Sequence, residues 1–562
     1  MTTERTSTQR QTRRHQVVRR ATESAQYEIG GQTYEVPAAS VCSGIEIKPV
    51  YRGDDLQDFD ESKDLGEPGG FPFTRGIHPT MYRTHLWSFR KYSGAGTSEE
   101  TNGMFRRQIA AGYNALSVAF DLPTQLGYDP DHPKVEFDVG RVGVAISTMD
   151  DYTAMFDEID IAGAGVNFTI NAPAPIIYAM HLVLAERRGI PWEVLRGTIQ
   201  NDPLKEFVAR GNFVFPPQPA VRLACDVVEF ARKHTPKFNA ITFNQVHIKE
   251  AGATSAFALA ASFVNAVEYI EEMKRRGYHI DDFGANMTFN LYGDMEFFEN
   301  ICQQRAARRL WAYLARDRFG AEKTRTMQFK YSGGGGSGTS LTRAHPLLNI
   351  ARIAYHALTM ALGGSQMVSV PAYDEAYAIP TEESTELCNL VSALVAYETG
   401  VTDVVDPLGG SYYVETLTDE IEAKIKEHMA EIESWGGAVA SIESGALARE
   451  IARQSYAWAR RIESGEDVVI GVNMFVPEHE APIELFEYDP RTRDRQIARV
   501  QAVRERRDSA AVEQALAVLS TATEQGENVI PPLMDCVRVD ATMGEMTEAL
   551  VQVLGRFDSP TF

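Results

Sequence analysis

Four short stretches decide the fold: VNFTIN (Val166–Asn171), TIQND (Thr198–Asp202), AITFNQVH (Ala240–His247) and NMTFN (Asn286–Asn290). In each of them polar and apolar residues alternate, which is the period of a β-strand with two different faces. Long amphipathic helical segments separate the stretches, and strands joined by helical crossovers run parallel. Parallel strands are normally buried on both faces and read as continuous apolar runs, so the polar face must meet something other than a hydrophobic core.

The polar side chains at period two predict a lumen. They are Asn167, Thr169, Asn171, Thr198, Gln200, Asp202, Thr242, Asn244, Asn286, Thr288 and Asn290. In a closed (β/α)8 barrel helices cover the outer face of every strand, so these residues point inward. We therefore predict an α/β fold, a hollow TIM barrel with a polar lumen that holds a long polar ligand. An open sheet with one wet face is the alternative, and the helices between the strands make it less favourable.

Eight strand-like segments support the barrel count. They are Ala115–Asp121, Val142–Thr148, Val166–Asn171, Arg196–Asp202, Ala240–Val246, Phe283–Leu291, Arg325–Tyr331 and Ser365–Val370. The pattern becomes almost wholly helical after Pro380, and a basic, polar stretch at Asp489–Arg507 separates a final helical region. The predicted organisation is an N-terminal arm, partly disordered, at residues 1–44, a barrel at 45–380 and a helical C-terminal region at 381–562.

Composition narrows the class of protein. The 562 residues are 44% hydrophobic, which predicts a large globular core. Their formal net charge of -22 argues against nucleic acid or an anionic membrane as partner. Five scattered cysteines without CxxC spacing predict neither disulfides nor a cysteine metal site, and favour a reducing cytoplasm. No run of 18 apolar residues occurs. The basic run Arg10–Arg20 is interpreted as a disordered tail or a subunit-docking arm, with a mitochondrial transit peptide as the alternative.

Function in such barrels collects where the strands end. Gln200 and Asp202 end the fourth predicted strand, His247 the fifth and Asn290 the sixth, and Arg210 follows the fourth. An imidazole at that place can hydrogen-bond a carbonyl oxygen of a ligand, although a lone histidine is more often structural.

A glycine-rich run, SGGGGSGTS (Ser332–Ser340), fits GxGxxG at Gly333, Gly335 and Gly338. A dinucleotide site also needs an acidic residue about 20 positions later, and the segment from Leu341 to Leu362 contains none. A Rossmann site is therefore disfavoured. A phosphate-binding loop after the seventh strand and a flexible loop remain as two readings of similar weight.

A series of longer motifs resembles one family. TRGIHPTMYRTHLWSFRKYSGAGTSEETN (Thr74–Asn102) is followed in order by LSVAFDLPTQLGYDPDHP, GTIQNDPLKEF, HIKEAGATS, DEAYAIPTE, DPLGGSYYVETLT and VIGVN. From about Ile45 to the C-terminus the chain resembles the large, substrate-binding chain of the adenosylcobalamin-dependent acyl-CoA mutases, of the methylmalonyl-CoA mutase type. The resemblance implies a TIM barrel with the pantetheine arm of a CoA thioester along its axis. It implies an isomerase that moves the thioester group to the neighbouring carbon by a radical mechanism.

The same resemblance implies partners. In the family, cobalamin sits on a separate domain that supplies a histidine to cobalt through a D-x-H-x-x-G motif, and that motif occurs nowhere in these 562 residues. We therefore expect the cobalt of adenosylcobalamin to be ligated by a cobalamin-binding small subunit. A hetero-oligomer with a large-subunit dimer is the expected assembly, and no metal ligand is assigned to this chain.

Site residues follow from the matching motifs. His247 corresponds to the histidine that hydrogen-bonds the thioester carbonyl, Gln200 is its expected neighbour, and Tyr92 matches the residue that packs between substrate and deoxyadenosyl group. Arg210 matches the arginine that pairs with the second carboxylate of methylmalonyl or succinyl groups. The further substrate residues implied are Thr80, Met81, Thr198, His85, Asn286 and Thr288. The implied cofactor-binding residues are Gly94, Leu122, Gln125, Glu250 and Glu375.

Several positions depart from the family pattern. His85 and Asn286 stand where arginines usually grip CoA phosphates, Val246 replaces the tyrosine before the active-site histidine, and Pro371 replaces an asparagine. Glycines 333–336 replace a segment with histidine and glutamine. These changes suit a different acyl group or acyl carrier, or a catalytically silent scaffold subunit, although Tyr92, Arg210 and His247 together argue against silence. A nucleotide-dependent oxidoreductase that uses the glycine run is the second rival.

Overall fold

The computed structural model describes residues 24–113, 115–479 and 483–558. Ten strands lie in two parallel five-stranded sheets. One sheet has the order β4 (Tyr92–Ser93), β5 (Ala115–Ala119), β6 (Gly165–Thr169), β7 (Gly197–Ile199) and β8 (Phe238–Asn239). The other has the order β3 (Ser88–Phe89), β12 (Met367–Ser369), β11 (Tyr331–Gly335), β10 (Met287–Gly293) and β9 (Ile241–Asn244). The predicted parallel α/β class is confirmed.

The two sheets share their edges. Only Arg90 and Lys91 separate β3 from β4, and only Ala240 separates β8 from β9, so at both junctions one continuous piece of chain serves both sheets. Backbone hydrogen bonding continues across the second junction, where the Thr242 amide donates to the Gln200 carbonyl over 2.8 Å.

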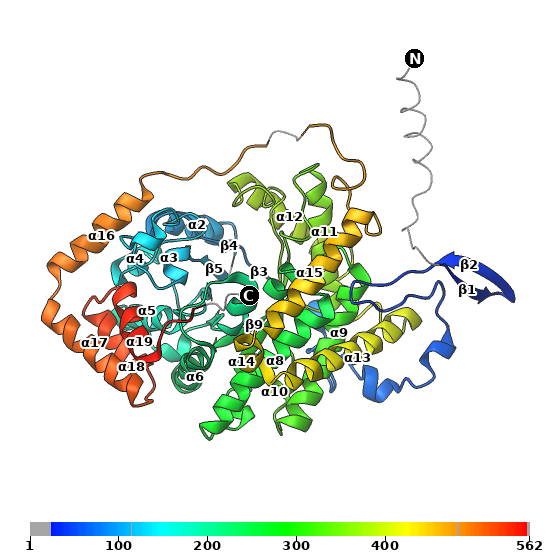
Figure 1. Cartoon of the computed structure of the whole chain (residues 1–562), viewed down its shortest axis with the longest axis horizontal. Helices are drawn as coiled ribbons and strands as arrows, with labels where there is room; N and C mark the ends of the chain where they lie inside the picture. Colours follow the sequence, from blue (N-terminus) through cyan, green and yellow to red (C-terminus); the bar gives the residue numbers. More distant parts are fainter. Residues whose placement is uncertain (1–23, 114, 480–482, 559–562) are drawn as a thin grey trace, which may run out of the picture.

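Helices cover one face of the strands. The main ones are α5 (Ala174–Arg187), α6 (Pro217–His234), α8 (Ser255–Arg275), α9 (Phe297–Tyr313) and α11 (Leu348–Gly363), which surround the strands in Figure 1. Apolar strand residues such as Phe168, Phe243 and Phe289 are at most 1% exposed and pack in a common core with these helices. Burial of this apolar face is the main stabilising term of the fold.

The polar residues of the alternating stretches share the other face and bond from strand to strand. Asn167 donates to Ser117 over 3.0 Å, the hydroxyls of Thr242 and Thr288 lie 2.7 Å apart, and Asn290 donates to Asn244 over 3.1 Å. These cross-strand pairs satisfy part of the polar surface that faces away from the helices.

Two expected strands are wrong, and one observed segment was not expected. Val142–Thr148 is not a strand: Val144 forms only isolated bridges, and the amides of Ser147 and Thr148 donate to Asp151 at the start of α4 (Met149–Met155). Arg325–Tyr331 is wrong because α10 (Thr324–Met327) occupies its first half and β11 begins only at Tyr331. The unexpected segment contains the short strands β3 and β4, and the charged Arg90 and Lys91 between them obscure the strand pattern in the sequence.

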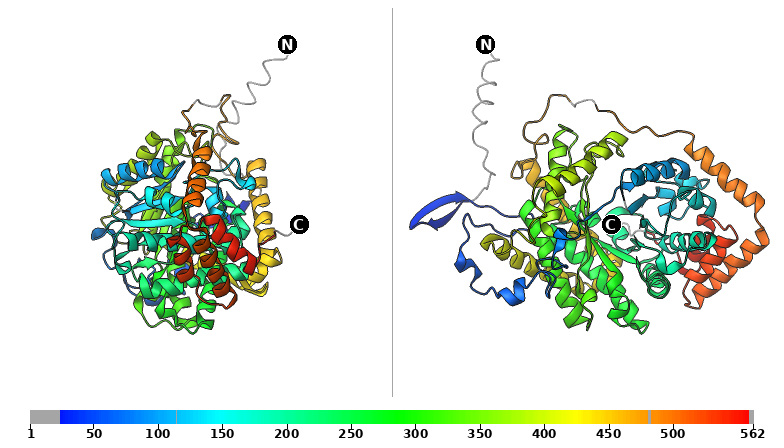
Figure 2. Two further views of the ribbon diagram at one scale, coloured as in Figure 1. Left: turned by 90° about the vertical axis from the view of Figure 1, so that its left-hand side faces the viewer. Right: turned by 180° about the vertical axis from the view of Figure 1, so that it is seen from behind.

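The helical C-terminal region forms two groups. The helices α12 (Glu382–Glu398), α13 (Tyr412–Ser434), α14 (Gly437–Glu443) and α15 (Ala446–Ser464) associate with the half of the molecule that contains α8, α9 and α11. The helices α16 (Thr492–Arg506), α17 (Ser509–Glu524), α18 (Ile530–Arg538) and α19 (Met543–Leu554) lie on the opposite side, where α18 packs on α5 (Figure 2).

The basic stretch Asp489–Arg507 is a docking helix and not a separator. Most of it forms α16, and its arginines reach acidic groups of the sheet-containing part. Arg499 contacts Glu99 on α2 (Ser98–Ala110), and Arg506 lies 2.6 Å from Asp150. The positive charge therefore holds the last helices against the body.

At the N-terminal end, β1 (Ser24–Ile29) and β2 (Gln32–Pro37) form an antiparallel hairpin that projects from the body (Figure 1). The predicted tail or docking arm at Arg10–Arg20 lies outside the described residues. Among the helices that the structure describes, none is long and apolar enough to cross a membrane.

A buried histidine makes this core sensitive to acid. His181 on α5 is 0% exposed, its Nδ1 lies 3.1 Å from the Tyr152 hydroxyl, and burial, with a smaller effect of Arg188, lowers its pKa to about 3. Below the ordinary histidine pKa of about 6.5, His181 is protonated in the unfolded chain but stays neutral in the folded chain. Stability is therefore lost as pH falls from about 6.5 towards 3.

We expect H181F to remove this dependence. The slope of the unfolding free energy against pH between 4.5 and 6 should decrease by about 1.4 kcal/mol per pH unit, the contribution of one proton. Urea denaturation at several pH values measures the slope. The control is Y152F, which loses the contact with His181 but keeps the imidazole and should keep the wild-type slope. An unchanged slope in H181F contradicts the assignment.

Candidate functional site

Three of the predicted catalytic and acyl-binding residues gather at one end of the strands. Burial raises the pKa of Tyr92, and the charge of Arg210 opposes that rise. Burial lowers the pKa of His247, and Lys205 and the same Arg210 lower it further, so all three predicted side chains share one electrostatic neighbourhood. Tyr92 belongs to β4, His247 follows β9, and Arg210 follows β7. The sequence prediction that these residues converge is consistent with this geometry.

His247 does not end a strand as expected. It lies in α7 (Gln245–Glu250), a short helix that begins directly after β9. Its Nδ1 is buried and has no hydrogen-bond partner among the described residues. Burial lowers its pKa well below the ordinary value, and the nearby Lys205 and Arg210 lower it further. His247 is therefore a neutral imidazole with one unused nitrogen, as a ligand-binding donor or acceptor requires.

Arg210 is the last residue of the π-helical turn η7 (Glu206–Arg210), and α7 packs against this turn. Its guanidinium is 23% exposed and lies 3.5 Å from Glu206. That carboxylate is already engaged, because Lys205 and Asn171 each donate to it over 2.6 Å. Arg210 therefore keeps hydrogen-bonding capacity for an anion that enters the site.

The sequence reasoning named Asp202 but missed the buried Lys205–Glu206 pair beside Arg210. Lys205 is 0% exposed and forms an ion pair with Glu206, which is 1% exposed. Burial lowers the pKa of Lys205, and burial raises the pKa of Asp202 to about 6. The sequence does carry a signal for this pair, because NDPLKEFVAR places four charged residues directly after a strand. Charged groups that a fold buries together cluster at functional sites.

A second missed residue, Arg90, lies two positions before Tyr92, in the link between β3 and β4. Tyr92 is 45% exposed, yet surrounding protein raises its pKa, and the combination fits a side chain that borders an internal space. Burial lowers the pKa of Arg90 to about 10, and no ion pair or hydrogen bond joins its guanidinium to the rest of the described chain. The spacing Arg90–Tyr92 is the strand period, which could have identified Arg90.

Two predicted glutamines are engaged in local hydrogen bonds. Gln200 is 6% exposed and accepts from Asn171 over 3.2 Å. Gln125 ends α3 (Leu122–Gln125), where it donates to the Phe120 carbonyl over 2.6 Å and accepts from Asn212 over 3.0 Å. Gln125 thus links the loop after β5 to the loop that carries Arg210.

The remaining predicted cofactor residues, like His247, follow the C-terminal ends of strands, and this end of the sheets is called the rim below. Leu122 is half-buried at the start of α3. Gly94 has φ +152, and a Cβ there would come within 2.4 Å of the Ala119 carbonyl oxygen, so only glycine allows this approach of the chains. Glu375 accepts from the Ala372 amide over 2.9 Å.

The glycine run contributes to a strand and to a carboxylate contact. Gly333–Gly335 belong to β11, so the flexible-loop reading is wrong for these residues. The Gly338 amide donates to Glu250 over 2.8 Å. Burial raises the pKa of Glu250, and Glu375 is close enough to raise it further. Because two carboxylates lie together here, the phosphate-binding reading of the run loses its support.

The predicted CoA-end residues lie at the opposite end of the strands. Thr80 and His85 are exposed and flank the turn η4 (Met81–Arg83) before β3, and Asn286 precedes β10 and donates to the Pro236 carbonyl over 3.0 Å. Met81 is only 6% exposed. Thr198 and Thr288 lie between the two ends, on the polar face. The predicted substrate residues thus extend along the strands instead of forming one cluster.

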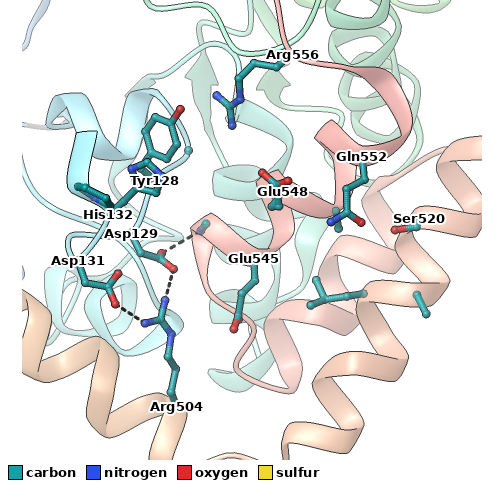
Figure 3. Close-up of a pocket in the computed structure, with 16 residues that line it drawn as sticks. Tyr128, Asp129, Asp131, His132, Arg504, Ser520, Glu545, Glu548, Gln552 and Arg556 are labelled. Carbon is teal, nitrogen blue, oxygen red and sulfur yellow. Dashed lines mark hydrogen bonds and ion pairs between the residues drawn. The ribbon is translucent and has the colours of Figure 1, made fainter. Parts of the chain in front are cut away.

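A separate cavity of about 760 Å³ lies away from these residues, between the loop after α3 and the C-terminal helices (Figure 3). Tyr128, His132 and Arg556 line it together with residues of α17 and α19. Arg504 closes one side through Asp129 at 2.8 Å and Asp131 at 2.5 Å.

Comparison with known proteins places the chain. Residues 40–556 match the family model described as methylmalonyl-CoA mutase. The chain is 39% identical over 519 residues to the 2-hydroxyisobutanoyl-CoA mutase large subunit of Aquincola tertiaricarbonis, covering 92% of each chain. It is 38% identical over 533 residues to the methylmalonyl-CoA mutase of Cereibacter sphaeroides, covering 95% of this chain and 75% of that one. It is 37% identical over 520 residues to the methylmalonyl-CoA mutase large subunit of Streptomyces virginiae, covering 91% and 70%. The chain belongs to the methylmalonyl-CoA mutase family.

Proposed function

We propose that this chain is the large subunit of a two-component carbon-skeleton mutase that isomerises an acyl thioester. The observation that carries the proposal is the convergence of His247, Arg210 and Tyr92 at the ends of three different strands. A neutral imidazole can hydrogen-bond a thioester carbonyl, and an arginine with spare hydrogen-bonding capacity can bind a carboxylate. An aromatic ring can pack against the deoxyadenosyl group.

The two sheets form one closed barrel in this proposal. Joining β3 with β4 and β8 with β9 gives eight parallel strands, and the shared edges support closure. Residues 45–380 are then the (β/α)8 barrel, with residues 1–44 as an arm and 381–562 as a helical region. The polar face, which hydrogen-bonds from strand to strand, becomes the wall of a lumen that accommodates the pantetheine arm.

Each residue has one role in the proposed reaction. His247, with Gln200 beside it, hydrogen-bonds the thioester oxygen and stabilises negative charge there as the group migrates. Arg210 pairs with a second carboxylate of the acyl group. Tyr92 covers the reacting carbon and excludes water. Thr198 and Thr288 bond the pantetheine arm, and Thr80, Met81, His85 and Asn286 bind the nucleotide end of CoA.

The rim suits the nucleoside half of adenosylcobalamin. Glu250 and Glu375 supply carboxylate acceptors for ribose hydroxyls, and Gly94, Leu122 and Gln125 border the same space. When bound, this cofactor supplies the radical that starts a carbon-skeleton rearrangement. A separate cobalamin-binding subunit holds the cobalt in this proposal. The five cysteines are free, which supports a reducing, cytoplasmic setting.

Methylmalonyl or succinyl is the proposed acyl group, because Arg210 remains available to an anion. The similarity to a 2-hydroxyisobutanoyl-CoA mutase large subunit keeps a second acyl group in view. Incubation of the chain with its cobalamin-binding subunit and a panel of methylmalonyl, isobutyryl and 2-hydroxyisobutyryl thioesters, on CoA and on pantetheine, separates the two. Absence of any isomerised product identifies a silent scaffold.

We expect the purified chain alone to bind adenosylcobalamin weakly. The D-x-H-x-x-G motif that supplies the cobalt ligand in the family does not occur in the sequence, and in this proposal the two rim carboxylates contact only the nucleoside. Gel filtration with adenosylcobalamin should leave no visible cobalamin spectrum in the protein peak until the small subunit is added. A retained spectrum with the chain alone contradicts the two-component assignment.

A further inference from the structure

The C-terminal end of the described chain reaches the turn that carries Arg210. After α19 the chain passes Gly555, which has φ +82, and the Phe557 amide donates to the Val214 carbonyl over 2.9 Å. Val214 is 1% exposed and lies four residues after Arg210. Segments more than 340 positions apart in sequence are thus joined beside the proposed site.

An aromatic cluster fixes this junction. Phe207 and Phe213 flank Arg210 in sequence and stack in parallel, with ring centroids 5.4 Å apart. The ring of Phe557 meets both edge-on, at 4.9 Å and 5.0 Å, with interplanar angles of 86°. Stacked and edge-to-face pairs are the two favourable arrangements of aromatic rings, so Phe557 holds the two ends of the turn at a fixed separation.

The turn has little other internal support. Its first residues are anchored by the Lys205–Glu206 pair, but Arg210 and Gly211 return to Glu206 only through a 3.5 Å contact and a single backbone bond of 2.8 Å. Gly211 has φ +76, and a Cβ there would meet nothing within 4 Å. Outside its packing against α7 and α15 and the hydrogen bond from Asn212 to Gln125, the position of Arg210 therefore depends on the rings on either side of it.

The C-terminal segment, which comprises α19 and residues 555–558, is anchored where it begins. Asp129 accepts from the Thr542 hydroxyl over 2.6 Å and from the Gly544 amide over 3.0 Å at the start of α19, and Arg504 completes the contact. Beyond this anchor, one side of α19 borders the 760 Å³ cavity, across which Arg556 reaches over the Tyr128 ring at 4.9 Å (Figure 3). The C-terminal segment therefore meets the body at its start, along buried residues of α19 such as Thr547 beside Gly127, and again at Phe557.

We propose that Phe557 is a positioning residue, whose ring holds the Phe207–Phe213 turn so that Arg210 is placed for an acyl group with a second carboxylate. This inference rests on the proposed function for the role of Arg210. A small displacement of an orienting group costs up to about 100-fold in rate, so the turn need not unfold for selectivity to change.

Two measurements on the full chain test the proposal. In F557A, amide hydrogen exchange within residues 207–212 should be at least about tenfold faster than in the wild-type chain, because two aromatic pairs are lost. With the cobalamin-binding subunit, the ratio of kcat/KM for methylmalonyl to isobutyryl thioester should fall by about tenfold or more. F557Y keeps the ring and should restore both values.

The control is L550A, which weakens the buried face of the same helix, where Leu550 is 1% exposed, without touching the turn. It should lower thermal stability and leave both the exchange of residues 207–212 and the acyl ratio unchanged. Unchanged exchange in F557A, or an unchanged ratio in active F557A enzyme, overturns the proposal, as does an equal loss of ratio in L550A. A wild-type chain that isomerises no thioester refutes the proposed function, and hydrogen exchange then still decides whether Phe557 holds the turn.

Discussion

His247→Ala should lower kcat far more than it raises KM for an acyl thioester. The Nδ1 of His247 is buried and has no protein partner among the described residues, and the ring is neutral because burial and two nearby cations depress its pKa. Its hydrogen bond to the thioester oxygen should strengthen as negative charge grows there, and loss of one such donor typically lowers the rate by about 100- to 1,000-fold.

Steady-state kinetics of the two-subunit enzyme measure this effect. His247→Gln is the matched variant, since its amide can still donate a hydrogen bond, and it should recover part of the lost kcat. Because the imidazole is already neutral, the pH profile of the wild-type enzyme between 6 and 8 should show no step attributable to His247. A His247→Ala enzyme with normal kcat and a raised KM would show that His247 only binds the ground state.

The polar alternation explains why the sheet could be read from sequence. Thr242, Thr288, Asn244 and Asn290 were predicted to share one face, and their side chains bond across neighbouring strands. Successive side chains of a strand point to opposite faces, so polar and apolar residues alternate in the sequence when the two faces differ in polarity. The residues of the polar face were therefore predictable even though the strand ends were not.

The errors have a common cause in backbone hydrogen bonding that residue type does not reveal. Val142–Thr148 has the composition of a strand, but Asp151 accepts the amides of Ser147 and Thr148 and starts a helix instead. The Thr148-x-x-Asp151 capping box was the overlooked signal. Gly333–Gly335 gave no period because glycine has no side chain to show which face it occupies.

The sequence proposes which residues form the candidate site but not the geometry around them. His247, Tyr92 and Arg210 came from motif resemblance, whereas the buried Lys205–Glu206 pair and the Phe557 contact join segments that sequence spacing cannot relate. Long-range contacts of this kind depend on how the C-terminal helices dock, which involves apolar residues of α17, α18 and α19 in the common core as well as ion pairs such as Arg504 with Asp129.

Arg210→Gln should separate dicarboxylic from monocarboxylic acyl groups. The guanidinium is 23% exposed, and its neighbour Glu206 is already neutralised by Lys205 and hydrogen-bonded by Asn171. A substrate carboxylate can therefore form a charge-assisted pair with Arg210, which a glutamine cannot replace. Removal of one member of a desolvated pair costs about 3 to 5 kcal/mol, which corresponds to a loss of roughly 100-fold or more in kcat/KM.

The measurement compares wild type and Arg210→Gln on methylmalonyl and isobutyryl thioesters with the cobalamin-binding subunit present. The methylmalonyl value should fall by the amount given above, while the isobutyryl value should change little, since that acyl group offers no charge to the arginine. Arg222→Gln, which removes an arginine on α6 whose guanidinium donates to the Glu527 carbonyl at the surface, should leave both values unchanged. If Arg210→Gln lowers both values equally, Arg210 serves the fold of its turn and not the recognition of the acyl group. The carboxylate must then be bound by another cation, for which the unpaired Arg90 is the next residue to substitute.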